Sequence, residues 1–387
     1  MKHNWEYKTL QDVCVDFVVP QRDKPTAFDG DIPWCRIEDI EGRFLNGSKT
    51  NQLVTKELAD SMNMHICPKG TVICACSATI GKQAITTVDC YTNQTFIGII
   101  SDPRQLYNVY LYHFLNSQTE QLKKMGTGAT IKYISKKKIE SLTIPVPPLA
   151  IQEQIVAELD KVSEIIEKKK QQVKELDNLA QSIFYDMFGD PVENEKGWEV
   201  KKLGEECSEL RYGTSRPAVE NGKYGYLRMG NLTISGHLDL SDLKYIDIPE
   251  NEIEKCLVRK GDVMFNRTNS LELIGKTCLF DLDEPMVIAG YIIRVRLKTT
   301  LHPRYVVSLF NIQTMKNVLR KMAKGAVNQA NINSKELSSI NIPIPPLSLQ
   351  QSFAQKIEAI EKQKELITAS IKEMQTLFDS RMEYYFG

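Results

Sequence analysis

A stretch that runs from Ile144 to Gly189 recurs from Ile342 to Gly387, and this repetition constrains the fold more than any other feature of the sequence. The stretch begins with IPVPPL in the first copy and with IPIPPL in the second. Because proline lacks an N–H and drives the residue before it into an extended conformation, these openings are not expected to be helical. We expect a long helix to begin directly after each of them.

The apolar residues that follow are spaced in steps of four and three, which indicates a helix with a heptad seam. Corresponding positions lie 198 residues apart, since 353 − 155 and 385 − 187 both equal 198. The chain is therefore a tandem duplication of a globular region followed by a helix. Gly189 is expected to end the first helix in the left-handed conformation. The seam residues are Ile155, Leu159, Val162, Ile166, Val173, Leu176, Ala180, Ile183 and Met187 in the first copy, and Phe353, Ile357, Ile360, Ile367, Ile371, Met374, Phe378 and Tyr385 in the second.

The duplication extends upstream of the helices, into the globular regions. Pairing the two helices is the simplest way to bury both seams within one chain, and antiparallel pairing would relate the two globular regions by a pseudo-twofold axis. The predicted fold is α+β: two tandem mixed α/β domains, at 1–143 and 190–341, separated by two long helices, at 144–189 and 342–387, that pair as an antiparallel coiled coil. The matching segments are Trp5–Leu10 with Trp198–Leu203, Arg36–Ile40 with Arg228–Leu232, Lys69–Cys76 with Lys260–Asn266, and Ile80–Lys82 with Ile274–Lys276.

Lys169 and Lys364 interrupt the apolar seam of the two helices. Both lie near the middle of their helix, so antiparallel pairing is expected to bring them to one layer. Two buried like charges would be costly, so both ammonium groups are expected to reach for nearby acids. Those acids are Glu164 and Glu167 in the first helix, and Glu361 and Glu365 in the second.

The composition limits where the chain can function and what it can bind. Forty-nine basic residues balance 49 acidic ones, so a nucleic-acid site would have to be local. No run approaches the roughly 18 apolar residues of a membrane span, and the N-terminus has no signal-peptide pattern. Nine cysteines without a paired spacing fit a reducing compartment. We expect a cytoplasmic protein that makes no contact with a membrane.

Motifs for catalysis or for cofactor binding are absent from the sequence. It lacks the nucleophile, phosphate-loop and zinc-protease motifs, and the glycine-rich and Pro-Pro-aromatic motifs of adenine methyltransferases. A metal set of His65, Cys67, Cys74 and Cys76 is conceivable, but its spacing is not that of a zinc site. Cys74 and Cys76 alternate along a predicted strand, so buried cysteines without a metal are the favoured interpretation. No cofactor is expected.

Two basic loops occur at the same place in both copies. Residues 121–138 contain six lysines and no acid, and residues 320–335 contain four basic residues and no acid. One lysine run alone usually indicates a solvated surface, but its recurrence beside polar residues that can reach base edges favours DNA binding. The predicted DNA-facing residues are Arg36, Ser77, Thr79, Lys82, Lys132 and Tyr133 in the first domain, and Arg228, Arg267, Asn269, Lys276 and Asn328 in the second.

The segments IPVPPLAIQEQIVAEL and FYDMFGDP, the Lys-Gly-Thr/Asp-Val strands followed by Ile-Gly-Lys, and the duplication together resemble the specificity subunit of type I restriction-modification enzymes. The resemblance covers essentially the entire chain. It implies two target-recognition domains, each reading one half of a bipartite, asymmetric site in double-stranded DNA. It also implies that the helices pair as a spacer and dock two methyltransferase (modification) subunits, which in turn bind restriction subunits.

The second copy departs from the first where Gln152-Glu153-Gln154 becomes Gln350-Gln351-Ser352, so a contact made by the acidic residue would be weaker there. The recognition loops differ among members of this family, so the resemblance assigns no base contacts. Two other functions stay open. One is a coiled-coil adaptor that binds protein partners; the other is a stand-alone restriction-methylation enzyme, which the missing methyltransferase motifs disfavour.

Overall fold

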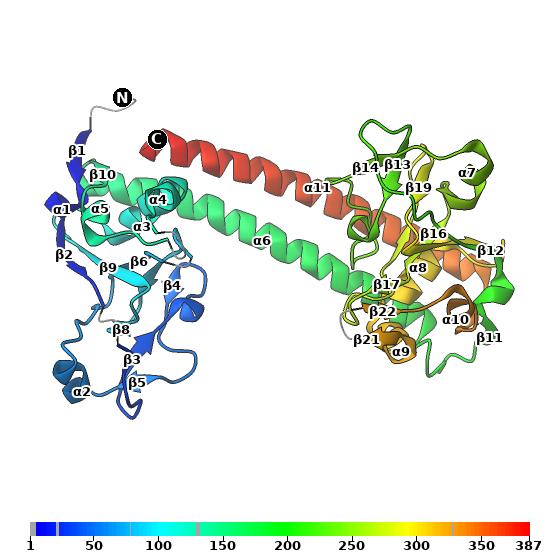
Figure 1. Ribbon diagram of the computed structural model, residues 1–387, viewed down its shortest axis with the longest axis horizontal. Helices are drawn as coiled ribbons and strands as arrows, with labels where there is room; N and C mark the ends of the chain where they lie inside the picture. The colour runs from blue at the N-terminus through cyan, green and yellow to red at the C-terminus, as the bar shows by residue number, and fades with distance from the viewer. Residues whose placement is uncertain (1–4, 21–22, 78, 129–131, 327–328) are drawn as a thin grey trace. The chain divides into compact units, whose positions relative to one another are not determined.

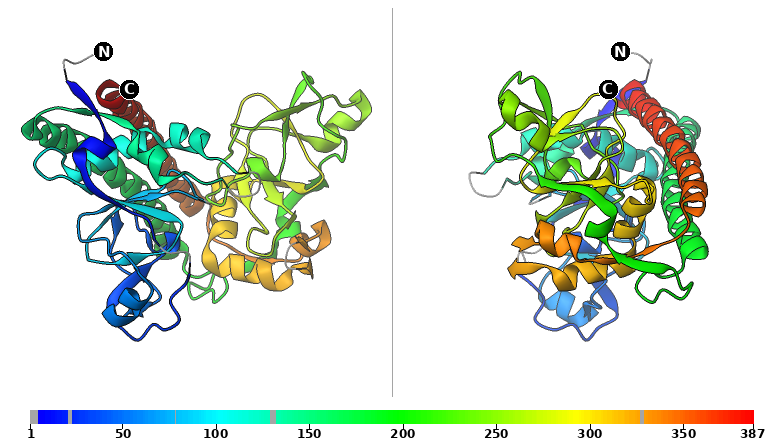
Figure 2. Two further views of the ribbon diagram at one scale, coloured as in Figure 1. Left: turned by 60° about the vertical axis from the view of Figure 1, so that its left-hand side comes forward. Right: turned by 90° about the vertical axis from the view of Figure 1, so that its right-hand side faces the viewer.

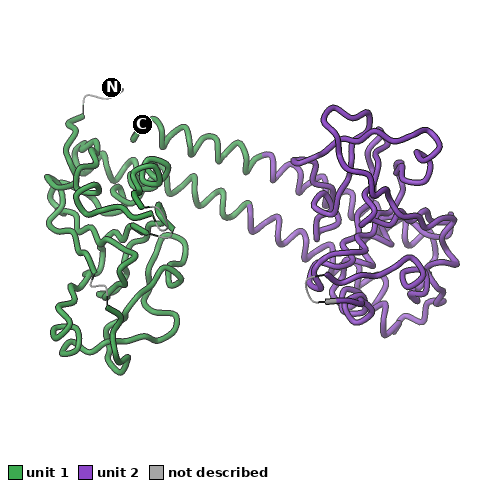
Figure 3. The backbone as a smooth tube through the Cα atoms, viewed as in Figure 1, with its two compact units in different colours: residues 1–169, 370–387 green, residues 170–369 purple. Residues whose placement is uncertain are grey.

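The computed structural model of the chain describes residues 5–20, 23–77, 79–128, 132–326 and 329–387. The chain divides into two compact units (Figure 3). Unit 1 comprises residues 1–169 and 370–387, and unit 2 comprises residues 170–369. Each unit therefore holds one globular region and a part of each of two long helices (Figure 1).

Unit 1 is a mixed α/β body built on a five-stranded sheet of order β2-β9-β6-β7-β4. A three-stranded sheet, β5-β3-β8, and a strand pair, β1-β10, accompany it. The elements are β1 (Glu6–Thr9), α1 (Leu10–Val13), β2 (Cys14–Val18), β3 (Ile32–Cys35), η1 (Ile37–Asp39), β4 (Phe44–Leu45), β5 (Leu53–Val54), α2 (Lys56–Ser61), β6 (Val72–Ala75), β7 (Gln83–Thr86), β8 (Tyr91–Thr92), β9 (Phe96–Ser101), α3 (Asn108–Ser117), α4 (Thr119–Met125), α5 (Lys136–Glu140), β10 (Thr143–Val146) and the start of α6 (Leu149–Phe188).

Unit 2 contains two four-stranded sheets, β12-β20-β16-β18 and β14-β13-β19-β15. A three-stranded sheet, β17-β22-β21, and a strand pair, β11-β23, complete it. The elements are β11 (Glu199–Lys202), η2 (Leu203–Glu206), β12 (Cys207–Tyr212), β13 (Tyr224–Leu227), η3 (Met229–Asn231), β14 (Lys244–Ile246), α7 (Glu250–Cys256), β15 (Leu257–Val258), β16 (Val263–Asn266), β17 (Thr268–Asn269), β18 (Thr277–Leu279), β19 (Met286–Ile288), β20 (Ile292–Leu297), α8 (Pro303–Asn311), α9 (Gln313–Met322), β21 (Lys324–Ala326), β22 (Gln329–Asn331), α10 (Ser334–Ser338), β23 (Asn341–Ile344) and α11 (Leu347–Phe386).

Both proline-rich segments begin in an extended and not a helical conformation, as their sequence predicts, and their first residues belong to the strands β10 and β23. Pro145 lies opposite Tyr7 in the β1-β10 pair, and Pro343 lies opposite Val200 in the β11-β23 pair. Both long helices begin after these strands, at Leu149 and at Leu347. Gly189 follows α6 with φ +74°, which confirms the predicted left-handed helix end. Although α6 and α11 are long, no helix among the described residues is long and apolar enough to cross a membrane.

Buried glutamines fix the start of each long helix to its globular region. The side chain of Gln152 accepts a bond from Tyr107 N (2.9 Å) and donates to the carbonyls of Gln105 (2.8 Å) and Pro147 (2.9 Å). Gln350 makes the matching set, with His302 N (2.8 Å), Thr300 O (3.2 Å) and Pro345 O (2.8 Å). The duplication therefore repeats individual side-chain contacts as well as elements.

The segments of α6 and α11 that belong to one unit lie side by side (Figures 1 and 2). In unit 1, Glu158 of α6 accepts a bond from Tyr385 Oη at 2.6 Å and pairs with Arg381 at 2.8 Å. In unit 2, Phe184 packs edge-on against Phe353, with ring centroids 5.7 Å apart. The helices therefore contribute to the core of both units.

The two seam lysines do not occupy one layer, which corrects the prediction made for them. In unit 2, Lys364 Nζ lies 2.6 Å from Asp177 Oδ1 of α6 and 3.2 Å from Glu361 Oε1. Asp177 follows Lys169 by eight residues, or about 12 Å along the helix. Lys364 is only 9% exposed, and these carboxylates raise its pKa against the opposing effect of its burial, which is the larger single cause. The expected pairing with Glu361 is confirmed, but the helix register differs from the predicted one.

Candidate nucleic-acid interface

Two loops of unit 1 that carry predicted DNA-facing residues are joined by backbone contacts. Ser77 and Tyr133 form an antiparallel bridge, and Tyr133 N donates to Thr127 O at 2.9 Å. Thr79 and Lys132 are exposed, and Tyr133 is 38% exposed. Lys82 closes the first loop, because its N–H donates to Thr79 O at 3.2 Å. The structure therefore brings these residues to one surface region of unit 1.

The lysine of each Ile-Gly-Lys triplet binds the 3-10 helix of its own unit. Lys82 Nζ donates to Ile37 O at 3.3 Å, and Lys276 Nζ donates to Met229 O at 2.7 Å. Ile37 and Met229 are the first residues of η1 and η3, and they directly follow Arg36 and Arg228. This repeated bond gives the Ile-Gly-Lys triplet a structural role in both units.

The two lysines differ in exposure. Lys82 is exposed, whereas Lys276 is only 8% exposed, and its burial lowers the pKa of its ammonium group. The ammonium group of Lys276 thus donates its hydrogen bond to Met229 O inside unit 2. Its DNA-facing role stays a prediction, and its position favours support of η3 over direct contact with a phosphate.

Arg36 and Arg228 start their 3-10 helices in the same way. Asp39 accepts a bond from Arg36 N at 2.7 Å, and Asn231 accepts one from Arg228 N at 2.8 Å. The Arg36 guanidinium pairs with Glu38 at 3.0 Å, and that of Arg228 pairs with Asp242 at 2.8 Å. Both side chains are about one-third exposed or less, so their guanidinium groups are partly held by the protein before any ligand arrives.

In unit 2, Asn269 belongs to the short strand β17, and Arg267 directly precedes this strand. Arg267 Nη2 donates to Asn331 Oδ1 at 3.0 Å, and its guanidinium stacks over Tyr212 with 4.8 Å to the ring centroid. Asn269 pairs with Ala330 across the two strands. Asn328 lies outside the described residues. Tyr212 and Asn331 were not singled out by the sequence, since a stack between β12 and the loop after β16 leaves no local pattern.

Several lysines of the basic loops are already engaged within the protein. Lys123 pairs with Glu120 at 2.7 Å, Lys138 Nζ donates to Met125 O at 2.6 Å, and Lys324 pairs with Glu336 at 2.6 Å. Acids outside the loop segments therefore neutralise part of the charge that the sequence had suggested was unpaired. Lys132 and Lys137 stay exposed.

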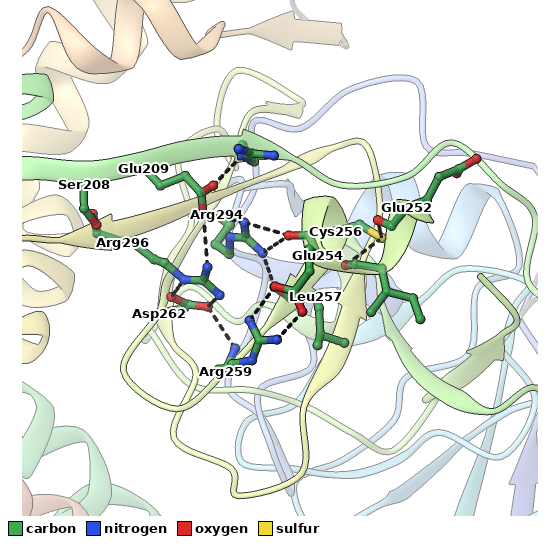
Figure 4. Close-up of polar contacts among 12 residues, drawn as sticks. Ser208, Glu209, Glu252, Glu254, Cys256, Leu257, Arg259, Asp262, Arg294 and Arg296 are labelled. Atoms are coloured by element: carbon green, nitrogen blue, oxygen red, sulfur yellow. Dashed lines mark hydrogen bonds and ion pairs between the residues drawn. The ribbon is translucent and has the colours of Figure 1, made fainter. Parts of the chain in front are cut away.

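A buried charge cluster includes two arginines of β20, for which sequence analysis makes no prediction. Arg294 is fully buried, pairs with Glu209 and donates to the backbone oxygens of Glu254 and Leu257 (Figure 4). On the same strand, Arg296 pairs with Asp262 at 2.8 Å. The pattern IIRVRL, with two charges in an apolar strand, was the available signal. The cluster holds the end of α7 and β15 on the sheet.

The cysteines considered as metal ligands are part of the core. Cys74 is fully buried in β6 and Cys76 directly follows that strand. Burial raises the pKa of the Cys74 thiol to about 12 and that of Cys67 to about 12. The described residues contain no group of three or more His, Cys, Asp or Glu side chains that could hold a metal ion. Burial of these cysteines is as predicted.

A cavity of about 550 Å³ lies in unit 2 between α9, α8 and the long helices. Lys276, Lys316, His237 and Glu361 are among its lining residues. Lys316 Nζ donates to Gly275 O at 2.6 Å. In unit 1 the Thr119 hydroxyl makes the equivalent bond to Gly81 O at 3.3 Å, so equivalent glycine carbonyls accept bonds from different side chains in the two units.

Comparison with known proteins identifies two repeats of one family. The family model described as "Type I restriction modification DNA specificity domain" matches residues 2–176 and again residues 195–376. The EcoKI specificity subunit of Escherichia coli (strain K12) is 24% identical over 353 residues, which cover 85% of this chain and 75% of the relative. The MjaIX specificity subunit of Methanocaldococcus jannaschii is 28% identical over 264 residues, which cover 62% of this chain and 60% of the relative.

Solved structures of the same kind share the fold. The S subunit of a type I restriction-modification system from M. genitalium aligns with a TM-score of 0.56 at 14% identity, over 99% of this chain and 96% of that chain. A chain from a structural study of complex assembly and conformational transition of the type I R-M system aligns with a TM-score of 0.63 at 18% identity, over 99% and 97%.

Proposed function

The chain belongs to the type I restriction modification DNA specificity family, and we propose from this that it is the non-catalytic DNA-recognition subunit of a type I restriction-modification complex. In this assignment each unit reads one half of a bipartite, asymmetric site in double-stranded DNA. Recognition is the contribution of this chain, and the chemical steps belong to its partner subunits.

The repeated bond from the Ile-Gly-Lys lysine to the 3-10 helix carries this proposal. Lys82 and Lys276 make it in both units, beside loops whose sequences differ. A fixed frame that presents different loops suits two domains reading different sequences. Duplex DNA offers two half-sites related by an approximate dyad, which a duplicated protein can match.

The proposed DNA contacts divide into two classes. Exposed Lys132 and Lys82 would bind phosphates and position the protein, whereas partly held side chains such as Arg267 would read base edges. Lys276 would support η3 from inside. The remaining proposed contacts are Arg36, Ser77, Thr79, Tyr133, Arg228, Asn269 and Asn328.

The long helices would pair as an antiparallel coiled coil and relate the domains at 1–143 and 190–341 by a pseudo-twofold axis. Contacts within each unit, such as Glu158 with Arg381 and Asp177 with Lys364, support this pairing. Their outer faces would dock two methyltransferase subunits, which would bind restriction subunits. Leu179, Leu366 and Leu377 are 47%, 66% and 41% exposed on these helices and are available for that contact.

The test is to express the chain with its methyltransferase partner and to map methylated bases in the host DNA. We expect one split motif, whose methylation disappears when the chain is omitted. Exchanging residues 190–341 for those of a relative should change one half of the motif and leave the other half intact. Methylation that is independent of the chain, or a single continuous motif, would refute the proposal.

A further inference from the structure

We propose that Arg43 and His237 are positioning residues, each of which fixes the DNA-recognition segment of its unit on a carboxylate of a long helix. The inference rests on the proposed function, because it assigns these residues a role in reading the half-sites. The first group of contacts, the Asp160 cluster, comprises Arg43, His113 and Asp160. The second, the Glu361 cluster, comprises Asp177, His237, Glu361 and Lys364.

In the Asp160 cluster, both oxygens of one carboxylate of α6 are engaged. Arg43 binds Asp160 in a bidentate manner, with Nη1 at 2.8 Å from Oδ2 and Nη2 bonded to Oδ1. His113 Nε2, which is almost fully buried, lies 2.9 Å from the same Oδ1. Burial of Asp160 raises its pKa, but the bonds from His113 and Arg43 outweigh burial and lower the pKa to about 2. A bidentate arginine fixes orientation as well as distance.

In the Glu361 cluster, the helix carboxylate that binds the basic residue of the turn belongs to Glu361 of α11. His237 Nε2 lies 2.8 Å from Glu361 Oε2, and Lys364 Nζ lies 3.2 Å from Oε1. Lys364 also pairs with Asp177 of α6 at 2.6 Å. His237 therefore joins a network that already holds the two helices together within unit 2.

Arg43 and His237 occupy comparable places in the two repeats, although the segment between the 3-10 helix and this residue is longer in unit 2. Each follows a glycine with positive φ, Gly42 at +56° and Gly236 at +87°. Each glycine lies in a turn closed by a backbone bridge, Glu41 with Phe44 in unit 1 and Leu232 with Leu238 in unit 2. In each unit the basic residue that follows the glycine contacts a carboxylate of a long helix. The residue is an arginine and the helix is α6 in unit 1, whereas the residue is a histidine and the helix is α11 in unit 2.

This turn directly follows the 3-10 helix that carries the proposed DNA contacts. In unit 1 the chain runs from Arg36 through η1 to Arg43, and Lys82 binds η1 from the other loop. Arg43 O also accepts a bond from Ile85 N at 2.8 Å, which ties the turn to β7. In unit 2, His237 O accepts a bond from Thr233 N at 3.0 Å. Asp160 in unit 1 and Glu361 in unit 2 thus bind the end of the segment that would face DNA.

The test uses Arg43→Gln and His237→Gln in the complex with the methyltransferase partner. Methylation rates are measured on targets in which each half-site is altered one base at a time. Loss of alignment by about 1 Å costs on the order of a hundredfold in rate, so we expect discrimination to fall by about ten- to a hundredfold. Arg43→Gln should affect one half-site only, and His237→Gln the other.

The chain supplies matched controls. Arg104→Gln removes an arginine that binds Asp102 through Nε (3.0 Å) and Nη2 (2.9 Å) in unit 1 without touching a long helix, and it should leave discrimination unchanged. The reciprocal replacements Arg43→His and His237→Arg install the residue used by the other repeat and should restore most of the discrimination. Equal losses at both half-sites, or the same loss with Arg104→Gln, would overturn the inference.

A readout without DNA separates this inference from the proposed function. If the unaltered chain gives no sequence-specific methylation, the proposed function fails. Hydrogen exchange of the free protein then still tests the clusters. Arg43→Gln should speed exchange in 41–45 but not in 232–238, and His237→Gln should do the reverse. Unchanged exchange in both segments would overturn the positioning role.

Discussion

Lys316, a lysine in α9 of unit 2, is only 7% exposed and donates to Gly275 O, whereas the Thr119 hydroxyl donates to the equivalent carbonyl of Gly81 in unit 1. Burial lowers the pKa of Lys316 to about 7, because the charged ammonium loses its hydration. An uncharged threonine satisfies the same carbonyl in the other repeat, so the scaffold itself does not require a lysine here. The protonation state of Lys316 should therefore affect the free energy of unfolding.

We predict that Lys316→Thr changes how stability depends on pH. Between pH about 7 and 10 the unfolded chain holds a proton on Lys316 that the folded chain lacks, so stability at this residue rises with pH by at most about 1.4 kcal/mol per pH unit. Urea unfolding at pH 7 and pH 9 measures the difference. The difference in the free energy of unfolding between the natural chain and Lys316→Thr should grow with pH in favour of the natural chain. Lys321→Thr, at an exposed position, is the control, and its free energy of unfolding should depend on pH as that of the natural chain does. Identical pH profiles for natural chain and Lys316→Thr would contradict the prediction.

A second prediction at this scale concerns Lys132, which is exposed in the loop beside Tyr133. A lysine that contacts a phosphate contributes affinity without regard to sequence. Lys132→Gln should weaken binding to all duplexes alike and should reduce the salt slope of the binding constant by about 1. Lys168→Gln, which removes an exposed lysine of α6 paired with Glu164, is the control. An unaltered salt slope would exclude Lys132 from the DNA interface.

The candidate interface could be predicted from the sequence only in outline. The repeated Ile-Gly-Lys triplet predicts a shared role for Lys82 and Lys276, and in the structure each lysine binds the 3-10 helix of its own unit. Exposure was not predictable, since Lys276 is buried while Lys82 is exposed, although the two share a motif. Burial depends on which segments fold over a residue, and these are distant in sequence. For the same reason the sequence does not predict the pairing of Arg43 with Asp160, which lies 117 residues away.

At the scale of elements, the long helices were the most predictable part, because their heptad pattern is local. The sheets were less so. On the equivalent strands β9 and β20, Gly98 faces Ile73 where Arg294 faces Met264. A Cβ on Gly98 would meet Cys67 Sγ at 2.7 Å, whereas the Arg294 side chain fills that side of unit 2 and reaches Glu254 and Leu257. One strand position thus supports two different local packings, which a repeat in sequence does not reveal.

We predict that Gln152→Leu destabilises the junction between β10 and α6. The replacement has similar size but leaves Tyr107 N–H and the Gln105 and Pro147 carbonyls without their partner. Each buried polar group left unsatisfied costs about 1–3 kcal/mol, so the free energy of unfolding should fall by at least that amount. Gln350→Leu should behave likewise in unit 2. Gln154→Leu, at an exposed neighbouring position, is the control. If Gln152→Leu lowers the free energy of unfolding no more than Gln154→Leu does, the role of Gln152 is refuted.

At the scale of the whole molecule, each long helix passes from one compact unit into the other. The division falls between Lys169 and Lys170 in α6, and between Ala369 and Ser370 in α11. Each unit makes its own contacts with the helices, such as Glu158 with Arg381 in unit 1 and Phe184 with Phe353 in unit 2. The helix stretch at the division can therefore be lengthened without removing a contact that either unit needs.

The last prediction is that the paired helices set the distance between the two half-sites. Forty residues of α6 span about 60 Å at the helical rise, enough to hold two reading surfaces about one turn of DNA, or about 34–36 Å, apart. One heptad inserted after Lys169 and one after Ala369 keeps the seam nearly in phase and lengthens the pair by about 10 Å, which is about three base pairs. Methylation of a target library with graded spacers should then move to a longer spacer with unchanged half-sites. A heptad in one helix only, which shifts one seam against the other, should abolish methylation. An active double insertion that keeps the original spacer would show that the helices do not measure the distance.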